Sequence, residues 1–164
     1  MRVSVICTGN ICRSPMGEVV LRELLSQDSE LFGVEVTSAG TARWHVGKPM
    51  DTRSRAALDR AGYTAPGTLG VFADTQYLDG HDLVVVMTRE HVYDVRSRLR
   101  REEVEVILLR DLISPHRGLD VPDPYYGDAD EFDECLATIT QGCRAVLLRL
   151  REIQRANAGQ SPAE

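Results

Sequence analysis

The chain has 164 residues, of which 43% are apolar and 27% charged, and its formal net charge is −6. This length and composition are ordinary for one globular domain that buries its core without needing a disulfide or a metal, and the negative charge gives no reason to expect nucleic-acid binding. No signal-peptide pattern is present, and the longest apolar run, at 83–87, is too short to span a membrane. We therefore expect a cytoplasmic protein without membrane attachment.

Hydrophobic patterning predicts an alternation of strands and helices. Runs rich in β-branched residues predict strands at 3–7, 34–38, 82–87 and 104–109. Helical spacing predicts helices from Pro15 to about Ser26, from Asp51 to Ala61, from Glu90 to Leu99 and, as a closing amphipathic helix, from about Asp130 to Ile153. Such alternation indicates a parallel sheet in an α/β domain, which we place at residues 1–154. The small polar residues 155–164 predict a flexible tail.

The segment CTGNICRSP follows the first predicted strand and has the features of an anion-binding turn. The first strand-to-helix turn of an open parallel sheet usually lies where a ligand binds. Ser14 is a good N-cap and Pro15 suits the first helical position, so the positive end of the helix faces the turn. Gly9 permits a backbone that turns N–H groups inward, and Arg13 adds a forked donor. The predicted phosphate-binding loop consists of Thr8, Gly9, Asn10, Ile11, Cys12 and Ser14, around Cys7 and Arg13.

Cys7 begins this turn. A helix N-terminus and an arginine both stabilise a thiolate, so we expect Cys7 to be ionised at neutral pH and to attack phosphorus. A nucleotide-binding loop is excluded because no G-K-[ST] sequence follows the glycine. The four cysteines are spaced C-x4-C and C-x7-C without a supporting histidine cluster, so we expect no metal site.

A general acid is predicted before the final helix, in the segment PDPYYG. Expulsion of an alkoxide or a phenolate needs a proton donor that afterwards acts as a base for water. Asp123 lies between Pro122 and Pro124, which restrict its backbone. Tyr125 and Tyr126 follow and would wall a slot for an aromatic ring. From the local sequence alone, a plain turn with both tyrosines packed on the core remains the alternative.

Four segments together resemble the low-molecular-weight protein tyrosine phosphatases: CTGNICRSP at 7–15, TSAGT at 37–41, WHVGKPMDTRS at 44–54 and DPYYGD at 123–128. The resemblance covers roughly residues 3–153. It implies a single three-layer domain with a four-stranded parallel sheet flanked by helices, the phosphotyrosine protein phosphatase I-like fold. It also implies that the protein needs no cofactor and no metal. The expected partner is a phosphotyrosine-containing protein, and we expect the protein to be a monomer.

The resemblance implies roles for individual residues. Cys7 is the nucleophile, Arg13 binds the phosphoryl oxygens and stabilises the transition state, and Asp123 is the general acid and then the base. Positions that hold the loop and assist the leaving thiolate match Asn10, Ser14 and Ser38. Positions that wall the substrate slot match Ile11, Trp44, Tyr125 and Tyr126.

The resemblance also suggests how activity is regulated, and the sequence departs from the family pattern at two positions. It suggests a reversible Cys7–Cys12 disulfide under oxidation, and a tyrosine kinase acting on Tyr125 or Tyr126 is a possible partner. Gly17 stands where the family usually has alanine, which should weaken the helix by up to about 1 kcal/mol. Thr88 stands where aspartate is common, but threonine also caps a helix.

Three alternatives to a tyrosine phosphatase share features of this sequence. Thioredoxin-linked arsenate reductases share the loop but need further cysteines after the third strand, and residues 80–95 contain none. Protein-arginine phosphatases resemble this loop with threonine at the position of Ile11 and lack the paired tyrosines. A non-catalytic phosphotyrosine-binding module would not need Cys7, Arg13 and Asp123 together. We therefore expect a cysteine-dependent protein tyrosine phosphatase with a phosphocysteine intermediate and an acidic or near-neutral pH optimum.

Overall fold

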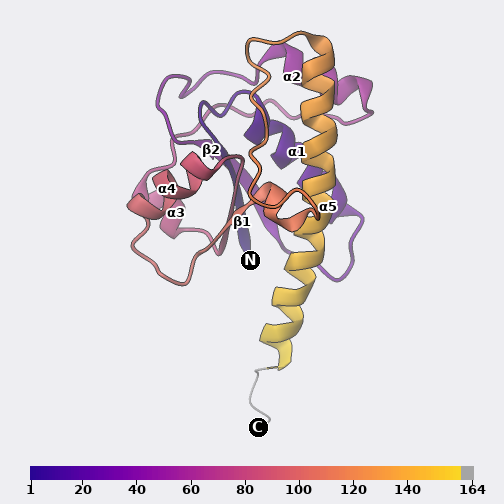
Figure 1. Ribbon diagram of the computed structural model, residues 1–164. Helices are drawn as coiled ribbons and strands as arrows, with labels where there is room; N and C mark the ends of the chain where they lie inside the picture. Colours follow the sequence, from indigo (N-terminus) through magenta and orange to yellow (C-terminus); the bar gives the residue numbers. More distant parts are fainter. Residues whose placement is uncertain (160–164) are drawn as a thin grey trace.

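The computed structural model describes residues 1–159 (Figure 1). The strands are β1 (Arg2–Cys7), β2 (Glu35–Gly40), β3 (Leu83–Val86) and β4 (Glu105–Leu108). The helices are α1 (Arg13–Ser26), α2 (Thr52–Arg60), α3 (Thr75–Asp79), α4 (Arg89–Arg98), the 3-10 helix η1 (Leu109–Leu112) and α5 (Ala129–Gly159). The predicted alternation of strands and helices is confirmed.

The four strands form one parallel sheet in the order β2-β1-β3-β4, which confirms the expected fold class. β1 lies inside the sheet and pairs with β2 on one side and β3 on the other. Its residues from Val3 to Cys7 are buried, as is typical of a parallel strand covered on both faces. The strand order reverses at β1, so the carboxyl end of β1 is the point in this topology where a ligand is expected.

Helices cover both faces of the sheet and create two apolar cores. The larger core joins α1, α2 and α5 to one face, and the smaller core joins α3 and α4 to the other; Figure 1 shows these two groups on opposite sides. The predicted apolar stripe of α5 is buried at Phe132, Leu136, Ile139, Cys143, Val146 and Leu150, with Leu147 partly buried. The sheet is therefore the middle of three layers.

The last helix is longer than its apolar pattern predicts. α5 begins at Ala129 and continues to Gly159, past Ile153, so it includes the first part of the predicted tail. Ion pairs accompany the apolar contacts there, because Arg151 binds Asp28 at 2.8 Å and Arg155 binds Glu30 at 2.9 Å. The rest of the predicted tail, 160–164, lies outside the described residues. No helix among residues 1–159 combines the length and hydropathy needed to cross a membrane.

Two short helices, α3 and η1, were not predicted from the sequence. Each is too short for a 3.6-residue period to be recognised in its apolar residues. α3 begins where the Asp74 carboxylate accepts the Tyr77 N–H at 2.8 Å, and it ends at Gly80. The tertiary contacts of Leu78, which is fully buried, decide that this segment is helical.

Gly17 in α1 packs closely against the sheet. A Cβ built there would lie 2.9 Å from Val5 Cγ1 and 3.4 Å from Met87 Cε. Alanine would add about 1 kcal/mol of helix propensity, but overpacking costs about 1–3 kcal/mol. We expect Gly17→Ala to lower the free energy of unfolding by about 1 kcal/mol in urea denaturation.

The control for Gly17 is Gly67→Ala, because a Cβ at Gly67 would meet nothing within 4 Å. This second variant should not lose stability. A Gly17→Ala protein more stable than the parent would show that the core has room at this position and that helix propensity decides the outcome.

Candidate active site

A cavity of about 260 Å³ opens at the carboxyl end of β1. Its lining brings together most of the predicted site residues, which are Cys7, Thr8, Gly9, Ile11, Cys12, Arg13, Trp44, Asp123, Tyr125 and Tyr126. His45, which was not predicted as a site residue, also lines it. Asn10, Ser14 and Ser38 are buried and do not line the cavity. We call residues 7–14 the cysteine loop and residues 121–128 the aspartate loop.

The backbone of the cysteine loop turns at Asn10, not at Gly9 as the sequence suggested. Asn10 has a φ of 56°, in the left-handed region, whereas Gly9 does not. The side chain of Asn10 fixes this conformation, because its Oδ1 accepts the Val71 N–H at 2.8 Å while Nδ2 donates to two serines. Gly9 is needed for space instead, since a Cβ there would lie 2.8 Å from His45 Cδ2.

Ser14 does not cap the helix, contrary to the sequence prediction. α1 begins at Arg13, its N-cap is Cys12, and that cap has no side-chain hydrogen bond. Ser14 is already helical, and its hydroxyl lies 3.0 Å from Cys7 Sγ and 2.9 Å from Asn10 Nδ2. These tertiary partners replace the local N–H that a capping serine would bind. The positive end of the helix still faces the loop.

Glu18 is a site residue that the sequence analysis missed. It lies on α1 and is only 4% exposed. Its carboxylate accepts the Ser38 hydroxyl and pairs with Arg22 at 2.8 Å. A glutamate between the apolar positions Met16 and Val19 was the available signal, because a carboxylate on a buried face requires a partner.

Glu18 sets the direction of a hydrogen-bond chain that ends at Cys7. An ionised carboxylate only accepts, so the Ser38 hydroxyl donates to it. The Ser38 oxygen then accepts from Asn10 Nδ2 at 2.9 Å, and Asn10 gives its other amide hydrogen to Ser14. The Ser14 proton remains for Cys7 Sγ or for the more distant Ala39 carbonyl at 3.3 Å. A hydroxyl so arranged stabilises a thiolate.

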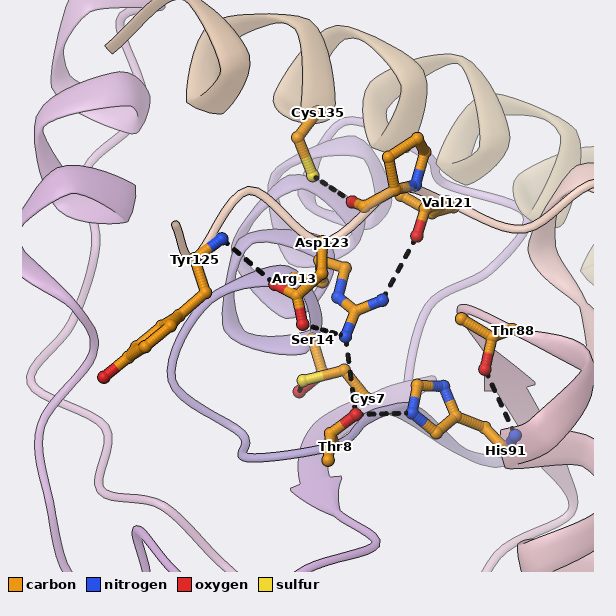
Figure 2. A network of polar contacts seen from close by, with 11 residues as sticks. Cys7, Thr8, Arg13, Ser14, Thr88, His91, Val121, Asp123, Tyr125 and Cys135 are labelled. Carbon is orange, nitrogen blue, oxygen red and sulfur yellow. Dashed lines mark hydrogen bonds and ion pairs between the residues drawn. The ribbon is translucent and has the colours of Figure 1, made fainter. Parts of the chain in front are cut away.

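Arg13 joins the two loops. Its guanidinium is buried and donates through Nη1 to the Val121 carbonyl at 3.1 Å and through Nη2 to the Asp123 carboxylate at 2.6 Å (Figure 2). A longer bond of 3.4 Å runs from Nη2 to Thr8 Oγ1. Nε is buried without a hydrogen-bond partner in the described structure. Nε and Nη2 are adjacent donors of the kind that grip a phosphate in a fork.

Asp123 and the tyrosines lie on the opposite wall of the cavity. The Asp123 carboxylate accepts the Tyr125 N–H at 3.2 Å in addition to its bond with Arg13. The two tyrosine rings meet edge to face with centroids 5.0 Å apart. Tyr125 is 37% and Tyr126 98% exposed, so neither tyrosine is packed into the core. Trp44 is likewise exposed, and these rings form an aromatic rim.

His91 supports the cysteine loop from α4 and was also missed. Thr88 caps α4, as its sequence allowed, by accepting the His91 N–H at 3.2 Å. The His91 ring is buried and its Nε2 lies 2.9 Å from Thr8 Oγ1 (Figure 2). Burial, followed by the charge of Arg13, lowers the pKa of His91 to about 4. The imidazole beside the loop is therefore neutral at physiological pH.

This buried histidine predicts a loss of stability in acid. The folded chain takes up the His91 proton near pH 4, whereas the unfolded chain takes it up near its usual pKa of 6.5. The contribution of His91 to the free energy of unfolding is therefore fully present above the pKa of the unfolded chain, and it is lost as the pH drops toward the pKa in the folded chain. We expect His91 to account for a loss of about 2–3 kcal/mol on acidification to about pH 4.

The measurement is urea unfolding of the parent and of His91→Asn across this pH range. The parent should lose more free energy of unfolding than the variant, so that the two stabilities converge in acid. Asparagine keeps the backbone N–H that Thr88 caps. Stability curves that stay parallel from neutral to acidic pH would contradict the assignment.

The other three cysteines differ from Cys7 in their surroundings. Burial raises the pKa values of Cys12, Cys135 and Cys143 to about 12, so these three are thiols at neutral pH. All four cysteines are free. Among residues 1–159, no group of three or more histidine, cysteine, aspartate or glutamate side chains is arranged to hold a metal.

The sheet, the cysteine loop at its switch point and the facing aspartate define an α/β phosphatase of the cysteine-dependent class. The sequence profile described as "Low molecular weight phosphotyrosine protein phosphatase" matches residues 2–157, and the chain belongs to this family. Membership implies phosphoprotein substrates.

Known relatives agree with this family assignment. The chain is 39% identical over 155 residues to "Low molecular weight protein-tyrosine-phosphatase" from Streptomyces coelicolor, covering 92% of this chain and 94% of the relative. It is 40% identical to "Low molecular weight protein-tyrosine phosphatase A" from Mycobacterium tuberculosis, covering 85% of each. The crystal structure of YfkJ from Bacillus subtilis superposes with a TM-score of 0.82 at 31% identity, covering 93% of this chain and 95% of that one.

Proposed function

We propose that the protein hydrolyses phosphotyrosine in proteins through a phosphocysteine on Cys7. The observation that carries the proposal is the meeting of three groups at one cavity: Cys7 next to the Ser14 hydroxyl, the buried Arg13 fork, and the Asp123 carboxylate opposite them. Each group supplies one requirement of phosphoryl transfer, which are a nucleophile, stabilisation of the equatorial oxygens, and a proton donor.

In the first step the Cys7 thiolate attacks phosphorus in line with the leaving phenolate. The phosphoryl oxygens accept from the loop N–H groups and from Nε and Nη2 of Arg13. A phosphoryl oxygen on Nη2 displaces the Asp123 carboxylate from that donor and leaves it free to carry a proton. Protonated Asp123 gives this proton to the tyrosine oxygen as the P–O bond breaks, so tyrosine leaves neutral.

In the second step water cleaves the phosphocysteine. Asp123, now ionised, takes a proton from the attacking water, and Cys7 leaves as a thiolate. The Ser14 hydroxyl, directed by Asn10, Ser38 and Glu18, donates to the sulfur as negative charge returns to it. Inorganic phosphate is released and the enzyme recovers its starting protonation state.

The aromatic rim favours phosphotyrosine over shorter phosphorylated side chains. Trp44, Tyr125, Tyr126 and Ile11 stand around the cavity mouth, where they would contact the faces of a phenyl ring while phosphate reaches the loop. The phosphate of a phosphoserine lies closer to its peptide backbone and would leave this rim uncontacted.

The experiment that tests the proposal is turnover of matched phosphotyrosine and phosphoarginine peptides in the presence of a chelator, by the parent and by Cys7→Ser. Chelator-resistant hydrolysis of phosphotyrosine that is lost in Cys7→Ser would support it. Preference for phosphoarginine would keep the cysteine mechanism but overturn the interpretation of Ile11 and the tyrosines. Absence of turnover with both peptides would favour a binding module.

Three further features belong to this proposal. We infer a cytoplasmic location, supported by four free cysteines, because disulfides are rare in reducing compartments. We infer a monomer, supported by a domain that buries its own two cores, and sedimentation equilibrium tests it. We also infer that a tyrosine kinase phosphorylates Tyr125 or Tyr126, and the exposure of Tyr126 supports this. Mass spectrometry after kinase treatment tests it.

Cys12 is expected to protect Cys7 from irreversible oxidation. Both side chains belong to the lining of one cavity. Peroxide converts the Cys7 thiolate to a sulfenic acid, and attack by the sulfur of Cys12 then forms a disulfide with release of water. Cys12→Ser should therefore regain less activity than the parent when a dithiol follows peroxide treatment. Equal recovery of the two proteins would remove the proposed disulfide.

A further inference from the structure

The aspartate loop needs a fixed position relative to the cysteine loop, because proton transfer requires hydrogen-bond distance. Within the loop, the Gly127 N–H donates to the Pro124 carbonyl at 2.8 Å, so the segment closes into a turn. Apart from this turn, the adjoining start of α5 and the bond of the Tyr125 N–H to Asp123 itself, a single side chain supplies every hydrogen bond that the described structure gives to residues 124–128. That side chain is Arg53 of α2.

Arg53 contacts the aspartate loop by hydrogen bonds and by stacking. Its Nη1 donates to the Tyr125 carbonyl at 2.8 Å and, more weakly, to the Gly127 carbonyl at 3.4 Å. The guanidinium carbon lies 4.6 Å from the ring centroid of Phe132 and 5.4 Å from that of Tyr125. These contacts begin two residues after Asp123, so a movement of Arg53 would be transmitted to the acid.

Asp51 holds the other side of Arg53 and is itself attached to the cysteine loop. The Asp51 carboxylate accepts from Arg53 Nε at 3.0 Å and from Nη2 at 2.8 Å. The backbone N–H of Asp51 donates to the Ile11 carbonyl at 2.9 Å. The bond to Arg53 lowers the pKa of Asp51 below its usual value, so the pair stays charged. The contacts run without interruption from Ile11 through Asp51 and Arg53 to Tyr125.

We propose that Arg53 is a positioning residue for the proton donor, and that the Asp51–Arg53 pair holds the aspartate loop at a fixed separation from the cysteine loop. The inference rests on the proposed role of Asp123 as general acid. Arg53 does not line the cavity, so its effect on the reaction passes through Asp123. Loss of Arg53 should therefore impair protonation of the leaving group more than nucleophilic attack or phosphate binding.

Two substrates that differ in their need for a proton separate these effects. p-Nitrophenyl phosphate releases a phenol acidic enough to leave as its anion, whereas phenyl phosphate releases a poorer leaving group that depends on the general acid. We expect Arg53→Gln to lower kcat/KM for phenyl phosphate about tenfold more than for p-nitrophenyl phosphate. Arg53→Lys should shift this ratio in the same direction, because an ammonium cannot bind Asp51 and the Tyr125 carbonyl with one planar fork.

Arg60→Gln is the matched control. Arg60 lies on the same helix and pairs with Asp133 of α5 at 2.6 Å, without a contact to the aspartate loop. It should leave the ratio of the two kcat/KM values unchanged. Asp51→Asn is the second test variant. Asp51 caps α2 by accepting the backbone N–H of Arg53 at 2.9 Å, and asparagine retains this acceptor but not the charge that holds the Arg53 side chain. It should shift the ratio in the same direction, so the proposal stays testable if Arg53→Gln does not fold.

The Asp123→Asn background completes the experiment. In this background Arg53→Gln should change kcat/KM by no more than about twofold for either substrate, because the carboxyl group that Arg53 positions is already lost. The proposal would be overturned if Arg53→Gln lowered kcat/KM equally for both substrates in the parent background. It would also be overturned if Arg53→Gln caused the same loss in the Asp123→Asn background as in the parent. If Asp123→Asn changes the ratio of the two kcat/KM values and Arg53→Gln does not, only this inference is overturned and the general-acid assignment stands. If Asp123→Asn leaves the ratio unchanged, the general-acid assignment is wrong and the inference fails with it.

Discussion

Replacement of Cys7 by serine is expected to lower kcat/KM for a phosphotyrosine peptide by at least ~10⁴-fold. A serine hydroxyl preserves the shape of the side chain and can still bond to Ser14. Unlike a thiol, it is not ionised by a helix N-terminus and an arginine, so no anionic nucleophile reaches phosphorus. Single-turnover hydrolysis of the peptide measures the loss directly.

Binding should survive the change at Cys7, because Arg13 and the loop N–H groups are untouched. Isothermal titration with the phosphotyrosine peptide should therefore still detect a complex. Cys143→Ala is the control, since Cys143 is buried and its Sγ lies 3.6 Å from the Gly17 carbonyl in the α1–α5 interface. It should remain as active as the parent. Turnover by Cys7→Ser within about tenfold of the parent would contradict the nucleophile assignment.

Asp123→Asn is expected to lower kcat/KM for phenyl phosphate by about 10²–10³-fold. Asparagine can still accept the Tyr125 N–H but can neither donate nor recover a proton as a carboxyl group does. The loss with p-nitrophenyl phosphate should be much smaller, because its leaving group needs less protonation. Steady-state kinetics with the two substrates measures this difference.

The pH dependence gives an independent test of Asp123. In the parent, kcat/KM should fall at high pH as the general acid loses its proton, and Asp123→Asn should remove that fall. Asp128→Asn is the control in the same loop, because the Asp128 carboxylate accepts the Asp130 N–H at 3.0 Å and asparagine can do the same. Its profile should match the parent. A parent rate that keeps rising above about pH 8 would exclude Asp123 as the acid.

The sequence predicted the elements whose determinants are local. A run rich in β-branched residues marks β1, and the turn residues after it mark the point where the strand ends. α1 begins at Arg13, two residues before the predicted start at Pro15. The apolar residues of α5 likewise give its buried face. The extension of α5 to Gly159 was missed because no apolar stripe marks its last turns, where Arg151 and Arg155 reach acidic residues far away in the chain.

The candidate site shows the same division. Proximity of Cys7 and Arg13 follows from one short loop, but nothing in their spacing reveals that Glu18 lies behind them or that Arg53 reaches Tyr125. Those contacts depend on which faces of α1 and α2 meet the sheet and α5. Ser14 was assigned a local capping role for the same reason, since its actual partner Asn10 becomes available only when the loop adopts a left-handed residue.

The left-handed backbone at Asn10 has a consequence for ligand affinity. A non-glycine residue in this region is disfavoured in an unfolded chain, and ordering it costs about 1–3 kcal/mol. In the folded chain the hydrogen bonds of Asn10 with Ser14, Ser38 and Val71 offset that cost before any ligand binds. An arriving oxyanion therefore does not need to order the loop backbone, and its affinity reflects its direct contacts less the cost of displacing the Asp123 carboxylate from Arg13. Conversely, any change that loosens β2 or the segment at Val71 makes the anion itself order the loop, and weaker binding results without the loss of a single ligand contact.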